Sequence, residues 1–129
     1  MPVFRLAALG AVLLLGCGPA VPAKFSEVKQ QVFTASCTFS SCHNKIAGGA
    51  GGLQLDSAVA YQQLVGVPAA GVTGRLRVVA GDLDASYLIE KLTRPTPSAG
   101  GRMPLGAEGL DAARLQLVRD WVSAGAKDD

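Results

Sequence analysis

The sequence predicts an all-α domain of about four short helices joined by long loops rich in glycine and proline. Residues that favour helix N-termini precede four stretches in which apolar side chains recur at helical spacing. Sixteen glycines and seven prolines mark the loops, which are too long for an idealised helix bundle. The chain of 129 residues shows no internal repeat, and its length fits one domain with at most a short tail.

The first two expected helices follow from their caps and stops. One begins with Ser26 as N-cap and runs to about Ala35. The next is capped by Asp56 and stopped by Gly66. A short segment that could be extended follows at residues 75–80.

The last two helices have clearer signals. The third is capped by Asp82 or Asp84 and ends before Pro95. The fourth is the best defined, because Asp111 lies at an N-cap inside a hydrophobic staple and Gly125 stops the apolar repeat.

The front of the chain is expected to be a processing segment. Arg5 precedes an apolar run from Leu6 to Leu15 that is too short to span a bilayer as a mature helix. The residues Leu-Leu-Gly-Cys ending at Cys17 resemble the lipobox of bacterial lipoproteins, which implies that Cys17 is acylated. An ordinary signal peptide is the alternative. The expected organisation is a lipoprotein signal peptide at 1–16, a lipidated N-terminus and tether at 17–24, and the domain at 25–129.

Charge and composition exclude several function classes. A net charge of +2 without a basic run argues against a nucleic-acid binder. The chain has a single histidine, His43, which belongs to the motif described next, so no histidine remains for a Ser/His/Asp catalytic triad. The glycines around residue 50 lack the strand-then-helix context of a phosphate-binding loop.

The chemistry begins at Cys37, Cys42 and His43, directly after the first expected helix. A histidine next to the second of two cysteines is the arrangement of c-type haem attachment, in which thiols add to the haem vinyl groups and the imidazole binds the iron. The usual spacer has two residues and this one has four, so the thioether at Cys37 is the weaker inference. A disulfide in an oxidising compartment and a zinc or copper site are the alternatives.

A second ligand is suggested sixty residues later, in the loop Gly-Gly-Arg-Met-Pro. Met103 is the only methionine after residue 16. It lies in a Gly/Pro-rich loop, where a methionine is poorly placed for core packing and well placed to be presented as a ligand. A thioether is a soft ligand suited to haem iron opposite an imidazole. A loop methionine without a function is the alternative, and the neighbouring Arg102 is expected to be solvated rather than paired with a haem propionate.

Together these motifs resemble the class I mono-haem c-type cytochromes, in the variant with a four-residue spacer, over roughly residues 25–126. The resemblance implies a cytochrome c-like fold around one covalent haem c. It implies thioethers at Cys37 and Cys42 and axial iron ligands at His43 and Met103. It also implies that the first and last helices cross beside the haem, with Phe33 and Trp121 at the crossing.

The expected function is therefore that of an electron carrier rather than an enzyme, because both axial positions of the iron would be filled. The protein is expected to be lipid-anchored at a membrane surface of the bacterial cell envelope, facing the periplasm or the outside. Its expected partners are redox proteins of the same envelope. Two alternatives stay open, a lipoprotein that binds copper or another metal and a structural lipoprotein stapled by a disulfide.

Overall fold

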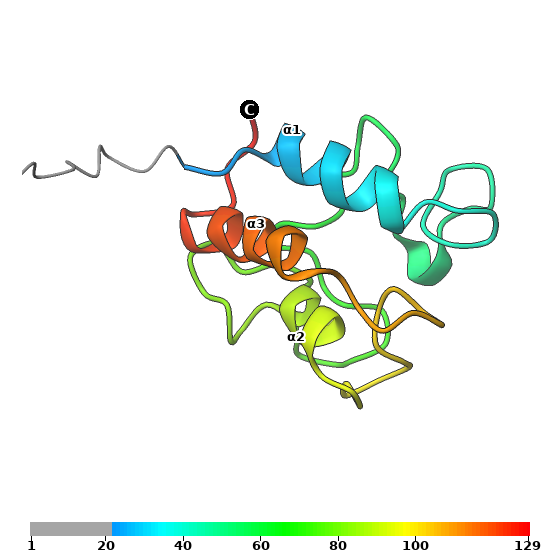
Figure 1. The fold of residues 1–129 in the computed structure, drawn as a ribbon. Helices are drawn as coiled ribbons and strands as arrows, with labels where there is room; N and C mark the ends of the chain where they lie inside the picture. The colour runs from blue at the N-terminus through cyan, green and yellow to red at the C-terminus, as the bar shows by residue number, and fades with distance from the viewer. Residues whose placement is uncertain (1–21) are drawn as a thin grey trace, which may run out of the picture.

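The computed structural model describes residues 22–129, so the expected signal peptide, Cys17 and most of the expected tether lie outside the described residues. The elements in chain order are α1 (Phe25–Val28), the π-helical turn η1 (Lys29–Thr34), the 3-10 turn η2 (Ala50–Gly52), α2 (Tyr87–Thr93) and α3 (Ala112–Ser123). Figure 1 shows α1 continuing directly into η1 as one helix, with α3 beside it and α2 below α3. Long loops connect these helices.

The predicted all-α, cytochrome c-like fold of about four short helices is wrong. Between residues 22 and 129 there are three α-helices, most of the chain is turn and loop, and a cytochrome c fold is not observed. The helix expected from Asp56 to Gly66 is replaced by a series of turns. Asp56 does not cap it, because its Oδ1 accepts a hydrogen bond from the backbone N–H of Lys45 at 2.9 Å. The carboxylate of Asp56, which was expected to cap a helix, instead binds the backbone of the loop at Lys45.

The first expected helix is confirmed over most of its length, with a different cap. Lys24 occupies the N-cap position, and Ser26 lies in the first turn. The backbone N–H and the hydroxyl of Ser26 donate to the two carboxylate oxygens of Asp129, at 2.8 and 2.6 Å. The C-terminus is therefore held against the start of α1, where Figure 1 places the label C.

The two later helices are confirmed. α2 ends at Thr93, before Pro95, and its N-cap is Ser86 rather than either expected aspartate. α3 has the expected cap, because the carboxylate of Asp111 accepts from the N–H of Arg114 at 2.9 Å. The expected extended segment at 75–80 forms isolated β-bridges with residues 65, 68, 82 and 86. None of the helices in the described residues is long and apolar enough to cross a membrane.

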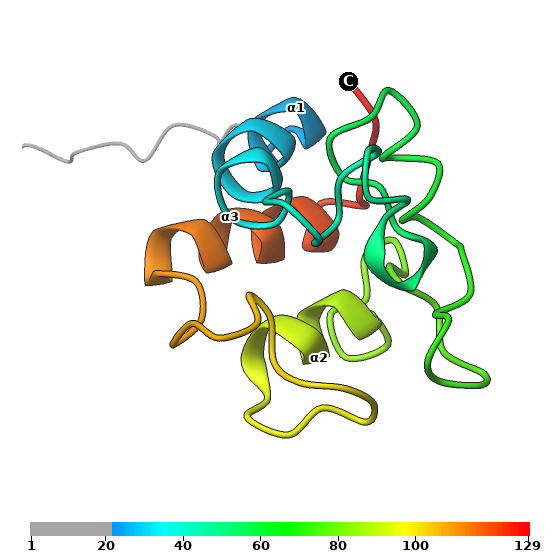
Figure 2. The same ribbon diagram turned by 90° about the vertical axis from the view of Figure 1, so that its right-hand side faces the viewer.

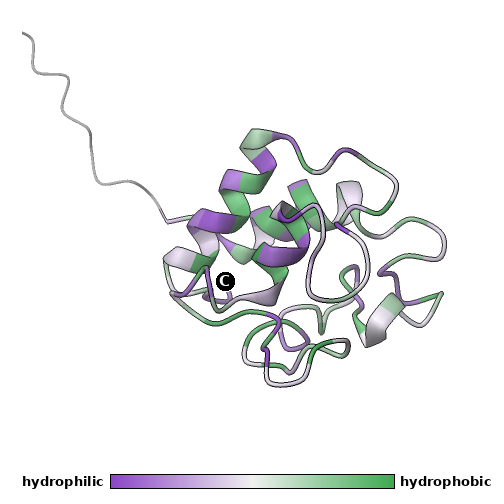
Figure 3. Ribbon diagram, turned by 90° about the horizontal axis from the view of Figure 1, so that it is seen from below, coloured by the Kyte–Doolittle hydropathy of each residue, from purple (hydrophilic) through white to green (hydrophobic). Residues whose placement is uncertain are grey.

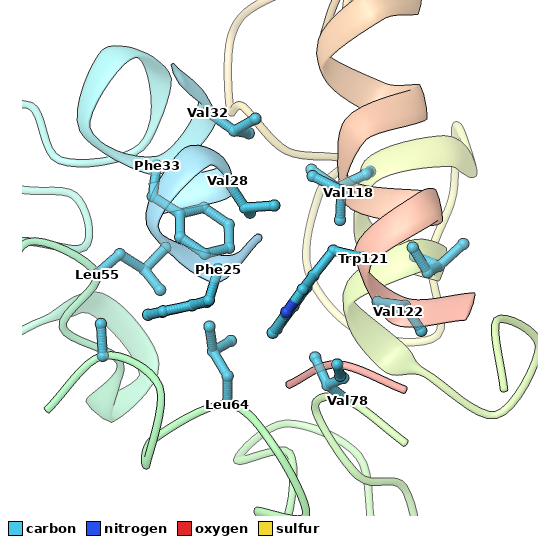
Figure 4. Close-up of a cluster of buried hydrophobic side chains, with 14 residues drawn as sticks. Phe25, Val28, Val32, Phe33, Leu55, Leu64, Val78, Val118, Trp121 and Val122 are labelled. Atoms are coloured by element: carbon cyan, nitrogen blue, oxygen red, sulfur yellow. The ribbon is translucent and has the colours of Figure 1, made fainter. Parts of the chain in front are cut away.

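The core lies between the first helix and α3, and aromatic rings fill it (Figure 4). The ring centroid of Phe25 lies 5.3 Å from that of Trp121 and 5.2 Å from that of Tyr61. Phe33 and Trp121 are both buried, as the crossing of the first and last helices predicts. The indole N–H of Trp121 donates to the carbonyl of Lys127 at 2.9 Å, which satisfies its one polar atom.

The 90° view in Figure 2 separates the helices from the long loops between residues 37 and 86, which lie to one side of them. Figure 3 shows hydrophobic and hydrophilic residues alternating along the helices, as expected for elements that bury one face only. The loops also carry many apolar residues, and part of that apolar surface encloses the cavity described next.

Candidate functional site

A cavity of about 290 Å³ lies between the end of the first helix, the loop around η2, α2 and the loop that precedes α3. Ligand-binding pockets typically start at roughly this size. Most of its wall is apolar. The lining residues with aliphatic or aromatic side chains include Phe33, Leu53, Leu55, Leu64, Leu88 and Leu92.

The structure brings three of the four predicted haem-site residues to this cavity. Cys37, His43 and Met103 all line its wall, although His43 and Met103 are sixty residues apart in the chain. Cys42 is exposed and is not part of the wall. Cys37, whose thioether is the weaker inference from the spacer, is thus the cysteine that lines the cavity.

Cys37 is placed by the end of the first helix. Its N–H donates to the carbonyl of Phe33 at 2.8 Å, which continues the helical pattern by one residue. Burial, and then the nearby Cys42, raise the pKa of the Cys37 thiol to about 11. The thiol therefore stays protonated at neutral pH. Both cysteines are free, without a disulfide.

The four-residue spacer is organised by Asn44, a residue that the sequence interpretation did not single out. Asn44 is buried, and its Nδ2 donates to the carbonyls of Thr38 at 3.2 Å and Ser40 at 2.6 Å. Its Oδ1 accepts from the N–H of Ala47 at 2.7 Å. One side chain thus satisfies backbone groups on both sides of His43. The sequence signal was a short polar residue that favours turns, directly after the histidine.

The ring of His43 is oriented by a backbone carbonyl. Its Nδ1 lies 3.3 Å from the carbonyl oxygen of Leu53. A carbonyl can only accept, so Nδ1 carries the proton and Nε2 of the neutral ring keeps a lone pair. This is the arrangement in which histidine binds metals, with one nitrogen hydrogen-bonded and the other free to coordinate.

Gly49 allows that arrangement. It has a φ of +70°, and a Cβ built on it would lie 2.5 Å from the carbonyl oxygen of Leu53. Any side chain at this position would push away the oxygen that orients His43. Neither its conformation nor its contact is visible in the sequence, where Gly49 is one of four glycines within five residues.

Met103 is half-buried and packs against the core. Its N–H donates to the carbonyl of Lys91 in α2 at 2.8 Å, which ties the methionine to that helix. The side chains of Tyr87 and Lys91 also bond carbonyls of the same loop.

Two cations, Arg77 and Lys91, also line the otherwise apolar cavity, and the sequence interpretation missed both. The Arg77 guanidinium donates to the carbonyl of Gln63 at 2.7 Å and to that of Gly51 at 3.0 Å. Burial lowers the pKa of Arg77 and that of Lys91, whereas Glu90 partly opposes the shift at Lys91. Arg102 does not line the cavity, and its guanidinium donates to the carbonyl of Glu108.

Among residues 22–129, no group of three or more His, Cys, Asp or Glu side chains is placed to hold a metal ion. Comparisons with protein-family models, with curated proteins and with solved structures found no match for the chain.

Proposed function

We propose that the chain carries one covalently attached haem in this cavity and works as an electron-transfer c-type cytochrome of the bacterial cell envelope. The proposal concerns the haem and its ligands. It does not extend to the cytochrome c fold, which the structure lacks.

The observation that carries the proposal is the convergence of His43 and Met103 on one apolar cavity. The chain has one histidine and, beyond residue 16, one methionine, and both line the same cavity. An imidazole and a thioether are a recurrent axial pair for haem iron. The apolar wall suits a macrocycle, and Arg77 and Lys91 supply two cations for its two carboxylates.

His43 and Met103 would each hold the iron through one atom. His43 would use Nε2, because Nδ1 is already bonded to the Leu53 carbonyl. Met103 would use its sulfur, with its backbone fixed to α2 through the Lys91 carbonyl. The aliphatic wall would exclude water, and a low local dielectric favours the less charged state of a bound redox group. A haem held there would supply one-electron transfer through its iron.

Covalent attachment involves the two cysteines unequally. Cys37 lines the cavity, which supports a thioether at this residue. Cys42 is exposed, so a second thioether requires its side chain to turn inward from the surface. We therefore expect the Cys37 bond to form in every attached molecule.

The test is production of the chain in a bacterial host with haem-attachment machinery, followed by denaturing electrophoresis with a haem stain and by intact-mass measurement. Covalent haem stays on the unfolded chain, so a stained band with the mass of one added haem supports the proposal. A colourless band under competent maturation refutes it. Metal analysis of that product would then separate a copper or zinc lipoprotein from a disulfide-stapled one.

The location is proposed from the sequence motif at Cys17. Acyl chains on this cysteine would hold the domain at the membrane surface, next to redox partners in the envelope. The variant Cys17→Ser is expected to move the protein from the membrane fraction to the soluble fraction. Membrane association of a Cys17→Ser protein from which residues 1–16 have been removed, as checked by intact mass, would contradict a lipid anchor.

A further inference from the structure

One face of α2 holds the loop that carries Met103. Residues 87, 90 and 91 lie at i, i+3 and i+4 and therefore share a face of the helix. The hydroxyl of Tyr87 donates to the carbonyl of Ala99 at 2.9 Å, and Lys91 Nζ donates to the same carbonyl at 3.0 Å. Lys91 Nζ also donates to the carbonyl of Gly101.

Glu90 is the buried charged residue of this face. It is 6% exposed, and its Oε1 accepts from the N–H of Ser98. Its Oε2 lies 3.2 Å from Nη1 of Arg75. The hydrogen bonding with Ser98, followed by the charges of Arg94 and Arg75, holds the pKa of Glu90 below its usual range. The side chain is thus a buried carboxylate with a specific partner on each oxygen.

Arg75 ties this carboxylate to the rest of the domain. Its Nη2 donates to the carbonyl of Asp84 at 3.2 Å, and its guanidinium carbon lies 6.0 Å from the centre of the Tyr87 ring. Arg75, Glu90 and Ser98 therefore link three segments that are separate in the sequence: the bridge segment at 75–80, α2 and the loop at 94–104.

We propose that Glu90 is a positioning residue for Met103. By anchoring the loop at Ser98, Glu90 holds the methionine sulfur on the cavity wall. The role rests on the proposed function, in which Met103 is an iron ligand. Glu90 itself does not line the cavity, so it acts through the loop and not by contact with a bound group.

Because the carboxylate of Glu90 is buried, its hydrogen bonds depend on these particular partners. Removing one partner of a buried hydrogen bond leaves the other unsatisfied, whereas an exposed residue would exchange its partner for water. Loss of the Glu90 side chain leaves the Ser98 N–H and Nη1 of Arg75 without their carboxylate acceptor, whereas Nη2 of Arg75 keeps the carbonyl of Asp84. Ser98 is exposed, so its freed N–H would turn to water. The loop would then be held mainly by Tyr87 and Lys91 at the carbonyls of Ala99 and Gly101, one and three residues nearer to Met103 than Ser98 is.

The first experiment needs no haem. Amide hydrogen exchange is measured on the full chain for the parent, Glu90→Ala, Glu90→Gln and a control, Tyr61→Phe. The control removes the hydrogen bond from Tyr61 to the carbonyl of Ala126 at 2.8 Å, in the aromatic core and away from the loop. In Glu90→Ala, exchange at residues 98–103 is expected to rise about tenfold relative to α3. Glu90→Gln keeps an acceptor for Ser98 and is expected to restore most of the protection.

The second experiment uses the haem-loaded protein. Glu90→Ala is expected to bind added imidazole about tenfold more tightly than the parent, because imidazole competes with the Met103 sulfur, and to have a lower reduction potential. Tyr61→Phe is expected to change neither property. The inference is overturned if exchange at residues 98–103 is unchanged in Glu90→Ala, or if Tyr61→Phe shows the same imidazole affinity and potential as Glu90→Ala. If the chain takes up no haem, the proposed function fails, and the exchange result still decides whether Glu90 anchors the loop.

Discussion

The substitution Gly49→Ala tests how His43 is oriented. The new Cβ would lie 2.5 Å from the Leu53 carbonyl oxygen, whereas real Cβ contacts are essentially never shorter than 3.0 Å and ordinary contact begins at 3.4 Å. The carbonyl must therefore move by about 0.5 to 0.9 Å, away from its 3.3 Å contact with Nδ1 of His43. The displacement weakens the one hydrogen bond that selects the ring tautomer.

Gly48→Ala is the matched control. Gly48 has a φ of +74°, close to the +70° of Gly49, and a Cβ there meets nothing within 4 Å. Both variants carry the cost of a left-handed alanine, about 1 kcal/mol. Gly49→Ala adds the backbone clash and the weakened hydrogen bond, for a total of about 2–4 kcal/mol.

The assays are urea unfolding and nitrogen NMR of the His43 ring. Gly48→Ala is expected to keep the ring predominantly protonated at Nδ1, and Gly49→Ala is expected to increase the Nε2-protonated form. The reasoning is refuted if the two variants have equal unfolding free energies, or if the tautomer populations in Gly49→Ala match those of the parent.

Three further predictions follow from the thiols, the proposed ligand and the chain termini. In the haem-free protein at pH 8, iodoacetamide is expected to alkylate the exposed Cys42 well before Cys37, because burial raises the pKa of the Cys37 thiol to about 11. Mass spectrometry of peptides measures the order of alkylation. Equal rates would contradict the burial of Cys37. In the haem-loaded protein, Met103→Ala is expected to retain covalent haem but lower the reduction potential, measured by redox titration; an unchanged potential and visible spectrum would remove Met103 from the ligand set. The hydrogen bonds from Ser26 lower the pKa of Asp129 in the folded protein, so their stabilisation is present above the unfolded pKa and is lost as pH falls through the folded pKa. Ser26→Ala is therefore expected to destabilise the protein at neutral pH and to make little difference in strong acid, and a pH-independent loss of unfolding free energy would argue against this linkage.

Helices whose signals are local were predictable from the sequence. Asp111 caps α3 through a residue three positions away. The end of α2 before Pro95 likewise follows from the chain itself, because proline does not continue a helix. The helix expected at Asp56 failed for the opposite reason. Its carboxylate had a competing donor in the backbone of Lys45, eleven residues earlier, and only the folded chain brings the two together.

The residues of the candidate site also differ in whether the sequence could identify them. Cys37, His43 and Met103 stood out because thiols, imidazole and thioether are rare in this chain and have distinctive chemistry. Arg77, Lys91 and the other polar residues at the site carried no such mark, since charged and amide side chains occur throughout the sequence. Their roles depend on which backbone carbonyls and cavity walls lie beside them.

What the sequence determined by itself was therefore the chemistry available and the ends of the helices with local caps. The tertiary structure decided which of those groups meet. It put Cys37 on the cavity wall and left Cys42 at the surface, and it enclosed Glu90 between Arg75 and Ser98. The physical reason is that burial and hydrogen-bond partners are set by segments far apart in the chain. A pattern of neighbouring residues can name a ligand, but packing decides where its side chain lies.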